Sequence, residues 1–229
     1  RHTLYREAYL QHLARGPGIV PVLGVSSRSG EEARHGESSP ISEEAGSCRS
    51  IERPFIPGLS LREILNAVKS GERSIDEVRG AALGIARGLF SALGQVNEFP
   101  FPRRGHRGVI HRDVTPDNVL VDDGEIWLHD FGLARTLEDP PLADDELLQG
   151  SPHFLAPEVV AGRQHSLASD VFQAALVCRL CFEPELWGDH GAARSTAKTP
   201  HVPPILLESL ASDPRRRPPV NYVFTVLSN

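Results

Sequence analysis

The alternation of hydrophobic and polar residues divides the chain into a short first part with strand-like runs and a longer part with helical periods. Residues 3–14 carry apolar side chains at close to helical spacing, which predicts a helix that ends before Gly16. Residues 19–25 and 50–56 are short apolar runs typical of strands. Between these runs, residues 26–47 are rich in Ser, Glu and Gly and have no period, so we expect an exposed loop there.

From residue 60 onward the hydrophobic pattern is mostly helical. Residues 61–68 and 75–93 are predicted helices, and short β-type runs separated by turn residues follow between residues 109 and 128. After Pro157 the helical pattern continues to the end, apart from a loop-like composition at residues 187–204. A small strand-containing start followed by a larger helical remainder predicts a two-lobed α+β protein.

Composition excludes several classes of protein. Hydrophobic residues make up 40% of the chain and charged residues 24%, which is ordinary for a soluble globular domain. The net charge of −6 gives no reason to expect nucleic acid or anionic lipid as the main partner. No apolar run is long enough to span a bilayer, so we expect no membrane segment in this chain. There is no signal peptide either, which favours a reducing, cytoplasmic location.

Three cysteines are too few for a disulfide framework. Cys178 and Cys181 have the spacing of a metal-binding pair, but no second ligand pair follows them. They lie in an apolar run, residues 171–182, that is predicted to be a helix. We therefore expect two buried free thiols, with a metal site as the less favoured alternative.

The residues that carry chemistry lie at 111–118 and 130–132. Phosphoryl transfer requires a carboxylate that accepts a hydrogen bond from the attacking hydroxyl, and oxygen ligands that hold Mg²⁺. Asp113, Asn118 and Asp130 supply these groups, with Asp130 seventeen residues after Asp113. All three are predicted to lie on loops that follow short strands.

In order and spacing, these motifs resemble the signature of the protein kinase family. The chain reads H-R-D-x-x-x-x-N at 111–118, D-F-G at 130–132 and A-P-E at 156–158. Each motif alone is weak, but together they are specific, and the resemblance extends over nearly the whole chain. It implies a two-lobed kinase-like fold, with residues 1–57 as a partial N-lobe that contains a loop insertion at 26–47. Residues 58–229 would be the mostly helical C-lobe.

The resemblance also implies cofactors, a partner and residue roles. ATP and Mg²⁺ are the implied cofactors and a protein is the implied substrate. Asp113 would be the catalytic base, and Asn118 and Asp130 would hold the metal and the nucleotide. Thr115 stands where serine/threonine kinases usually have a lysine that contacts the transferred phosphate. Residues with implied structural or regulatory roles are Glu7, His111, Arg112, Phe131, Gly132, Ser151, Glu158, Asp170 and Arg217.

Three of these roles are more specific. Glu7 resembles the glutamate of the N-lobe helix, and Asp170 resembles the aspartate that braces the catalytic loop. By the same likeness, Arg217 should pair with Glu158. The catalytic loop with Thr115 and the segment around Ser151 resemble serine/threonine kinases and not tyrosine kinases, with an ordinary loop hydroxyl as the alternative for Ser151.

The chain departs from the family pattern before Glu7. The family has a Gly-rich loop and a strand lysine there, but only six residues precede Glu7, and the chain contains two lysines beside 22 arginines. We therefore expect an N-terminally truncated kinase that is weak or inactive as a fragment. A pseudokinase that acts as a binding module and a small-molecule phosphotransferase remain alternatives. Near the hinge, Arg53 stands close to the gatekeeper position, which leaves the adenine site unassigned.

The segment between D-F-G and A-P-E is unusually acidic. Residues 137–149 contain no Ser, Thr or Tyr but five acidic residues. In kinases of this type, the arginine at the position of Arg112 often pairs with a loop phosphate. One hypothesis is that an acidic residue replaces that phosphate, and the alternative is a solvated acidic loop.

Overall fold

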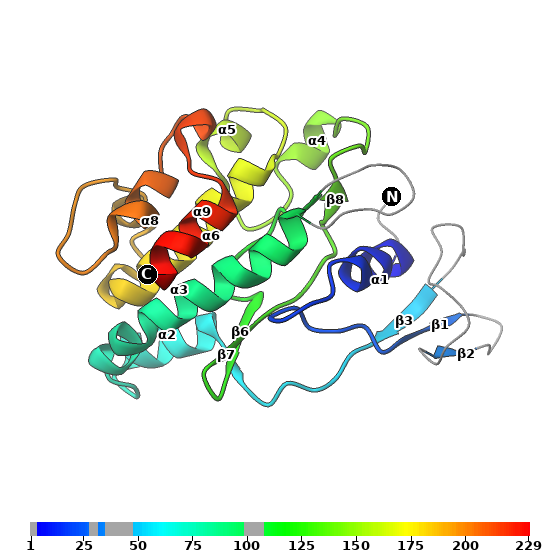
Figure 1. Ribbon diagram of the computed structural model, residues 1–229, viewed down its shortest axis with the longest axis horizontal. Helices are drawn as coiled ribbons and strands as arrows, with labels where there is room; N and C mark the ends of the chain where they lie inside the picture. Colours follow the sequence, from blue (N-terminus) through cyan, green and yellow to red (C-terminus); the bar gives the residue numbers. More distant parts are fainter. Residues whose placement is uncertain (1–3, 28–31, 35–47, 99–107) are drawn as a thin grey trace.

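The computed structural model describes residues 4–27, 32–34, 48–98 and 108–229. Figure 1 shows a small sheet and one helix at one end of the molecule and a larger group of helices at the other. The first group consists of α1 (Leu4–Leu13), β1 (Gly24–Ser27), β2 (Glu32–Arg34) and β3 (Cys48–Glu52). The remaining strands are β4 (Leu59–Ser60), β5 (Val109–Ile110), β6 (Val119–Asp122), β7 (Glu125–Leu128) and β8 (Arg135–Thr136). The remaining helices are α2 (Leu61–Ser70), α3 (Ile75–Glu98), α4 (Asp144–Leu147), α5 (Pro157–Val160), α6 (Leu167–Phe182), α7 (His190–Ala193), α8 (Pro204–Ser209) and α9 (Val220–Ser228), with short 3₁₀ turns η1 (Pro184–Leu186) and η2 (Pro214–Arg216).

The first sheet is antiparallel, with strand order β2-β1-β3 and Val25 opposite Ile51. Helix α1 packs on this sheet through a small cluster in which Tyr5, Ala8 and Val22 are buried with Val25. A four-residue strand cannot form a stable unit alone, so this contact with α1 supplies the apolar burial that the sheet needs.

Two expectations for this region are corrected. The loop predicted for residues 26–47 is wrong at residues 26–27, which end β1, and at residues 32–34, which form β2. Residues 28–31 and 35–47 lie outside the described residues. An edge strand is held by backbone bonds on one side and needs no alternating apolar residues, which is why composition failed to indicate it. The strand predicted at 19–25 is regular only from Gly24, because Ile19 forms an isolated parallel bridge to Leu128 instead.

Helix α3 forms the axis of the larger group and is longer than the hydrophobic pattern predicts. The prediction ended it at residue 93, but it continues to Glu98. The added turn is stabilised by tertiary contacts, since Val96 is fully buried and Asn97 donates hydrogen bonds from Nδ2 to Val109 O (2.9 Å) and to Asp170 Oδ2 (3.2 Å). Tertiary bonds of this kind override local propensity.

Helix α6 is the centre of the core. All of its residues from Ser169 to Phe182 are buried, and α3, α6 and α9 lie side by side in Figure 1. Cys178 and Cys181 are free, buried thiols on this helix, as predicted. Burial raises the pKa of Cys181 to about 12 and raises that of Cys178 as well. Over the described ranges, no helix is long and apolar enough to cross a membrane.

Candidate active site

The hairpin β6–β7 brings the two sequence motifs to the same place. Residues 111–118 connect β5 to β6, and residues 130–132 follow β7 after a single residue, His129. The strands are antiparallel with Val119 opposite Leu128, and one step beyond this pair His129 N–H donates to Asn118 O (3.1 Å). Because the start of one strand pairs with the end of the other, Asn118 and Asp130 lie at the same end of the hairpin.

The Asp113 carboxylate is held from two sides. Its Oδ2 accepts a hydrogen bond from Asn118 Nδ2 (3.0 Å), and its Oδ1 accepts one from the backbone N–H of Ser151 (3.1 Å). The approach of Ser151 requires the glycine before it. Gly150 has φ +110°, and a Cβ there would lie 3.2 Å from Asp113 Oδ1. Sequence reasoning placed Ser151 near Asp113 by resemblance, and the structure brings the two residues into contact.

The environment of Asp113 makes it a stronger base than an exposed aspartate. Burial raises the pKa of Asp113 and the neighbouring Asp130 charge adds to this, while the hydrogen bonds from Ser151 and Asn118 act in the opposite direction. The net effect is a raised pKa. A half-buried carboxylate whose geometry is fixed suits hydrogen bonding to a hydroxyl.

Asn118 and Asp130 have the oxygen atoms that a hard cation requires. Among the described residues, the side chain of Asn118 donates from Nδ2 to Asp113 O (2.9 Å) and to Asp113 Oδ2 (3.0 Å), which leaves its carbonyl oxygen for other ligands. Asp130 is exposed, with Oδ1 accepting from Gly132 N–H (3.1 Å). In the described part of the chain no group of three or more His, Cys, Asp or Glu could hold a metal. Mg²⁺ needs only one or two protein carboxylates beside waters and phosphates, so these residues fit it.

Helix α6 holds the backbone of the loop at residues 111–118 through side chains that project from the core. Asp170 is fully buried, and its carboxylate accepts hydrogen bonds from the backbone N–H groups of His111 (2.8 Å) and Arg112 (2.9 Å). Burial raises the pKa of Asp170 to about 6, although these donors favour the ionised form. Gln173 on the next turn donates to Arg112 O (3.1 Å) and accepts from Val114 N–H (3.2 Å). The loop is thus fixed even where Arg112 has φ +73°.

Phe131 anchors the D-F-G turn in the core. Its ring is fully buried and meets His111 edge-on, with ring centroids 4.7 Å apart. His111 Nε2 lies 3.2 Å from His129 O, and burial lowers the pKa of His111 to about 4. The imidazole is therefore neutral at pH 7 and can donate to that carbonyl. This packing fixes the turn that carries Asp130 and Gly132.

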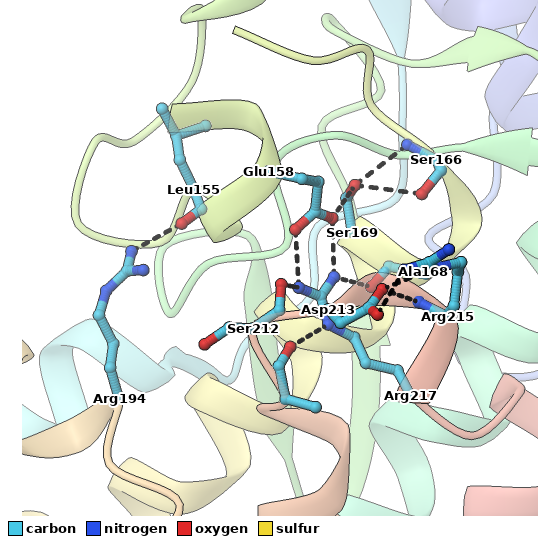
Figure 2. A network of polar contacts seen from close by, with 11 residues as sticks. Leu155, Glu158, Ser166, Ala168, Ser169, Arg194, Ser212, Asp213, Arg215 and Arg217 are labelled. Carbon is cyan, nitrogen blue, oxygen red and sulfur yellow. Dashed lines mark hydrogen bonds and ion pairs between the residues drawn. The ribbon is translucent and has the colours of Figure 1, made fainter. Parts of the chain in front are cut away.

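Figure 2 shows the ion pair between Glu158 and Arg217, far from each other in the sequence. The pair is bidentate, with both nitrogen–oxygen distances 2.7 Å, and the two side chains are 5% and 0% exposed. Ser169 Oγ also donates to Glu158 (2.8 Å), and the Arg217 guanidinium stacks on Phe172. The ion pair predicted from the sequence is confirmed, and it joins α5 to the segment after η2.

Thr115 differs from its expected placement at a phosphate. The side chain is fully buried, and its hydroxyl has no hydrogen-bond partner among the described residues. Protein atoms therefore cover the hydroxyl that the family resemblance places with the catalytic residues, at the transferred phosphate, and the structure presents no exposed hydroxyl at this position.

Comparisons with known proteins agree with this geometry. The family model of the protein kinase domain matches residues 105–214. A probable serine/threonine-protein kinase PknB of Bifidobacterium longum is 27% identical over 194 residues, which is 82% of this chain and 25% of that protein. Serine/threonine-protein kinase 12 of Arabidopsis thaliana is 31% identical over 180 residues, 77% of this chain and 32% of that protein. A probable serine/threonine-protein kinase pknA2 of Bifidobacterium longum is 30% identical over 125 residues, 54% of this chain and 14% of that protein.

The chain belongs to the protein kinase family. It has the mixed helical and antiparallel-sheet composition expected for an α+β kinase-like fold. The chain spans between 14% and 32% of the length of the three relatives named above.

Sequence reasoning missed the ionic contacts of α1 in this kinase-family chain. Glu7 on α1 pairs with Arg53, which directly follows β3. The preceding residue on the same helix, Arg6, pairs with Asp139 in the acidic segment, and Arg135 Nε lies 3.6 Å from the same carboxylate. The shortage of lysine is the one signal that could have indicated the first contact, since 22 of the 24 lysine and arginine residues are arginines.

The acidic segment also relates differently to Arg112 than the loop-phosphate hypothesis assumed. The Arg112 guanidinium donates to two backbone carbonyls, Leu133 O (3.2 Å) and Glu146 O (2.8 Å). Arg6 and Arg135 lie against Asp139 of the same segment. Burial would raise the pKa of Asp139, but the hydrogen bond and charge of Arg6 and the Thr136 N–H outweigh it, so the pKa is lowered.

Proposed function

We propose that this chain is the catalytic part of a protein serine/threonine kinase, which transfers the γ-phosphate of ATP to a hydroxyl of a protein in the presence of Mg²⁺. The observation that carries the proposal is the fixed Asp113 carboxylate, bonded to Asn118 Nδ2 and to the Ser151 N–H, at the site that also carries Asp130. A base and two kinds of oxygen ligand in one place are what phosphoryl transfer requires from a protein.

Each residue has a distinct part in this proposal. Asp113 accepts the hydrogen bond of the attacking hydroxyl and orients its lone pair toward the phosphorus. Asn118 and Asp130 hold Mg²⁺ through oxygen atoms, and the cation neutralises charge on the phosphates when bound. Asp170 and Phe131 keep the two loops rigid from the core side, which limits the reorganisation needed during transfer.

The choice of serine and threonine as acceptors is supported by the relatives and by Ser151. The named relatives are described as serine/threonine-protein kinases. Ser151 contacts the carboxylate that would bind the acceptor hydroxyl, so it lines the position of that hydroxyl. A short acceptor side chain would reach Asp113 there without displacing the segment around Gly150.

Calorimetry with Mg²⁺ and ATP, together with phosphate transfer to peptides that differ only in a Ser, Thr or Tyr acceptor, tests the proposal. We expect weak Mg²⁺-dependent binding and slow but detectable transfer to the Ser and Thr peptides, in line with the weak activity expected from the sequence. Asp130→Asn should abolish the Mg²⁺-dependent binding, whereas Asp123→Asn, an exposed aspartate in the β6–β7 turn, serves as the matched control. Binding without any transfer would leave a nucleotide-binding module and refute the kinase proposal. Transfer to the Tyr peptide alone would refute the acceptor class.

A further inference from the structure

The Arg53 guanidinium contacts two side chains on one face of α1. Its Nε donates to Gln11 Oε1 (3.0 Å), and its Nη2 forms an ion pair with Glu7 Oε1. Glu7 and Gln11 are four residues apart and therefore lie on the same side of the helix, one turn from each other. A guanidinium offers donors in a fixed fork that matches two such acceptors, which an ammonium group cannot reproduce. The contact therefore selects arginine.

The α1 end of this contact is itself fixed. Gln11 is fully buried, and its Nε2 donates to Val20 O (2.6 Å) in the segment that follows α1. Val20 N–H in turn donates to Leu128 O (3.1 Å) at the end of β7. Arg53 is thus connected through Gln11 and Val20 to the strand that leads into the D-F-G turn.

The second oxygen of Glu7 faces that turn. A Cβ built on Gly132 would lie 3.6 Å from Glu7 Oε2 and 3.0 Å from Asp130 Oδ1, so both carboxylates approach the same point. Two carboxylates this close repel each other unless a cation compensates one of them. Arg53 is the cation bound to Glu7, and the Arg53 and Glu7 side chains are 29% and 14% exposed, which limits screening by water.

We propose that Arg53 is a positioning residue for phosphoryl transfer, which fixes Glu7 and α1 against the D-F-G turn and balances the Glu7 charge beside Asp130. This inference deepens the proposed kinase function and rests on it for the catalytic consequence. Its structural part, the docking of α1 by Arg53, is independent of any activity.

The test compares four single variants and one double variant of the full chain. Arg53→Met removes the charge but retains most of the length, Arg53→Lys retains the charge but loses the fork, and Glu7→Gln removes the other partner. Arg15→Met is the matched control, because Arg15 is exposed just after α1 and its loss changes the net charge by the same amount. Hydrogen exchange of the α1 amides in the ligand-free chain reports docking, and kcat and KM for ATP report positioning.

We expect Arg53→Met to speed exchange across α1 about tenfold, the effect of losing about 1.4 kcal/mol. The exchange rate of Arg53→Lys should lie between those of Arg53→Met and the unchanged chain, and the exchange rate of Arg15→Met should equal that of the unchanged chain. The double variant Arg53→Met with Glu7→Gln should exchange no faster than Arg53→Met alone, because the two residues act as one unit. In turnover, Arg53→Met should lower kcat by about a hundredfold, the scale for a misplacement of about 1 Å, with a smaller change in KM.

Unchanged α1 exchange in Arg53→Met would overturn the inference, whatever the activity. Faster exchange with unaltered kcat would also overturn it, because Arg53 would then be structural only. If the unchanged chain neither binds Mg²⁺ with ATP nor transfers phosphate, the proposed function fails, while the exchange comparison still decides whether Arg53 docks α1. Should Arg53→Met fail to fold, Arg53→Lys and Glu7→Gln carry the same comparison.

Discussion

Replacement of Arg217 by methionine should lower the free energy of unfolding by about 3–5 kcal/mol, the range for breaking one side of a buried ion pair. The variant keeps an apolar stem near Phe172 but removes both 2.7 Å bonds to Glu158. It also removes the donors to Ala168 O and Ala211 O, each at 2.8 Å. These carbonyls move the expected loss toward the upper part of the range, because buried acceptors without partners are unfavourable. Small domains have a total stability of only about 5–15 kcal/mol, so the effect would be large.

Urea unfolding at pH 7, followed by tryptophan fluorescence, measures this loss. Arg215→Met is the matched control two residues away. Arg215 also forms an ion pair, with Asp213, but its side chain is 88% exposed, so we expect no measurable change. If Arg217→Met is indistinguishable from Arg215→Met, the reasoning from burial is refuted. A change in the slope with urea would mean that the two-state comparison does not apply.

The same variant should show a distinctive dependence on pH. Burial would raise the pKa of Glu158, but the bonds from Arg217 and Ser169 outweigh it and lower the pKa below its ordinary value of 4.5. The folded-state pKa is thus the lower one, so the stabilisation is complete above the unfolded pKa and is lost as the pH falls through the folded one. The difference between Arg217→Met and the unchanged chain should therefore narrow below about pH 4.5. A difference that stays constant on acidification would mean that packing, and not charge, carries the effect.

Three further predictions concern the site. Asp113→Asn should lower phosphate transfer by about 10²–10⁴-fold while calorimetry still detects Mg²⁺ and ATP binding, and retained turnover would exclude Asp113 as the base. Burial raises the pKa of Asp113 above its ordinary value of 3.8, so kcat/KM should fall as the pH is lowered through this raised pKa. If the fall of kcat/KM at low pH is the same in Asp113→Asn, another group causes it. Asp139→Ala should detach the acidic segment from Arg6 and Arg135 and speed hydrogen exchange at residues 135–142, whereas unchanged exchange would support the solvated-loop alternative.

Motifs carried by contiguous residues were predictable from the sequence, and long-range partners mostly were not. The run 111–118 identified Asp113 and Asn118, because these two residues lie in one loop whose spacing is visible directly in the sequence. The Glu158–Arg217 pair was predicted only through family resemblance. Charge and spacing alone do not indicate which of the many arginines meets a glutamate 59 residues away.

The failures have a common physical cause. Arg53 meets Glu7 across 46 residues, and β2 forms by backbone pairing that leaves no mark on hydrophobic periodicity. The end of α3 is fixed by Asn97, whose side chain donates hydrogen bonds to Asp170 and Val109, outside its own helix. In each case a tertiary contact overrides the local pattern, and a local pattern is all that a single sequence displays.

The two thiols of α6 provide a built-in reporter of global opening. Cys178 and Cys181 are fully covered, and burial raises the pKa of both, so an alkylating reagent meets neither an accessible sulfur nor a thiolate in the native chain. Modification then requires the central helix to become exposed, which happens only when the core opens. In a background with Cys48 replaced by serine, the rate of alkylation under native conditions would measure the population of open molecules without any denaturant. Ligands that stabilise the folded chain would be detected as protection of these sulfur atoms from alkylation. Binding partners can therefore be screened by measuring the mass of the chain after alkylation.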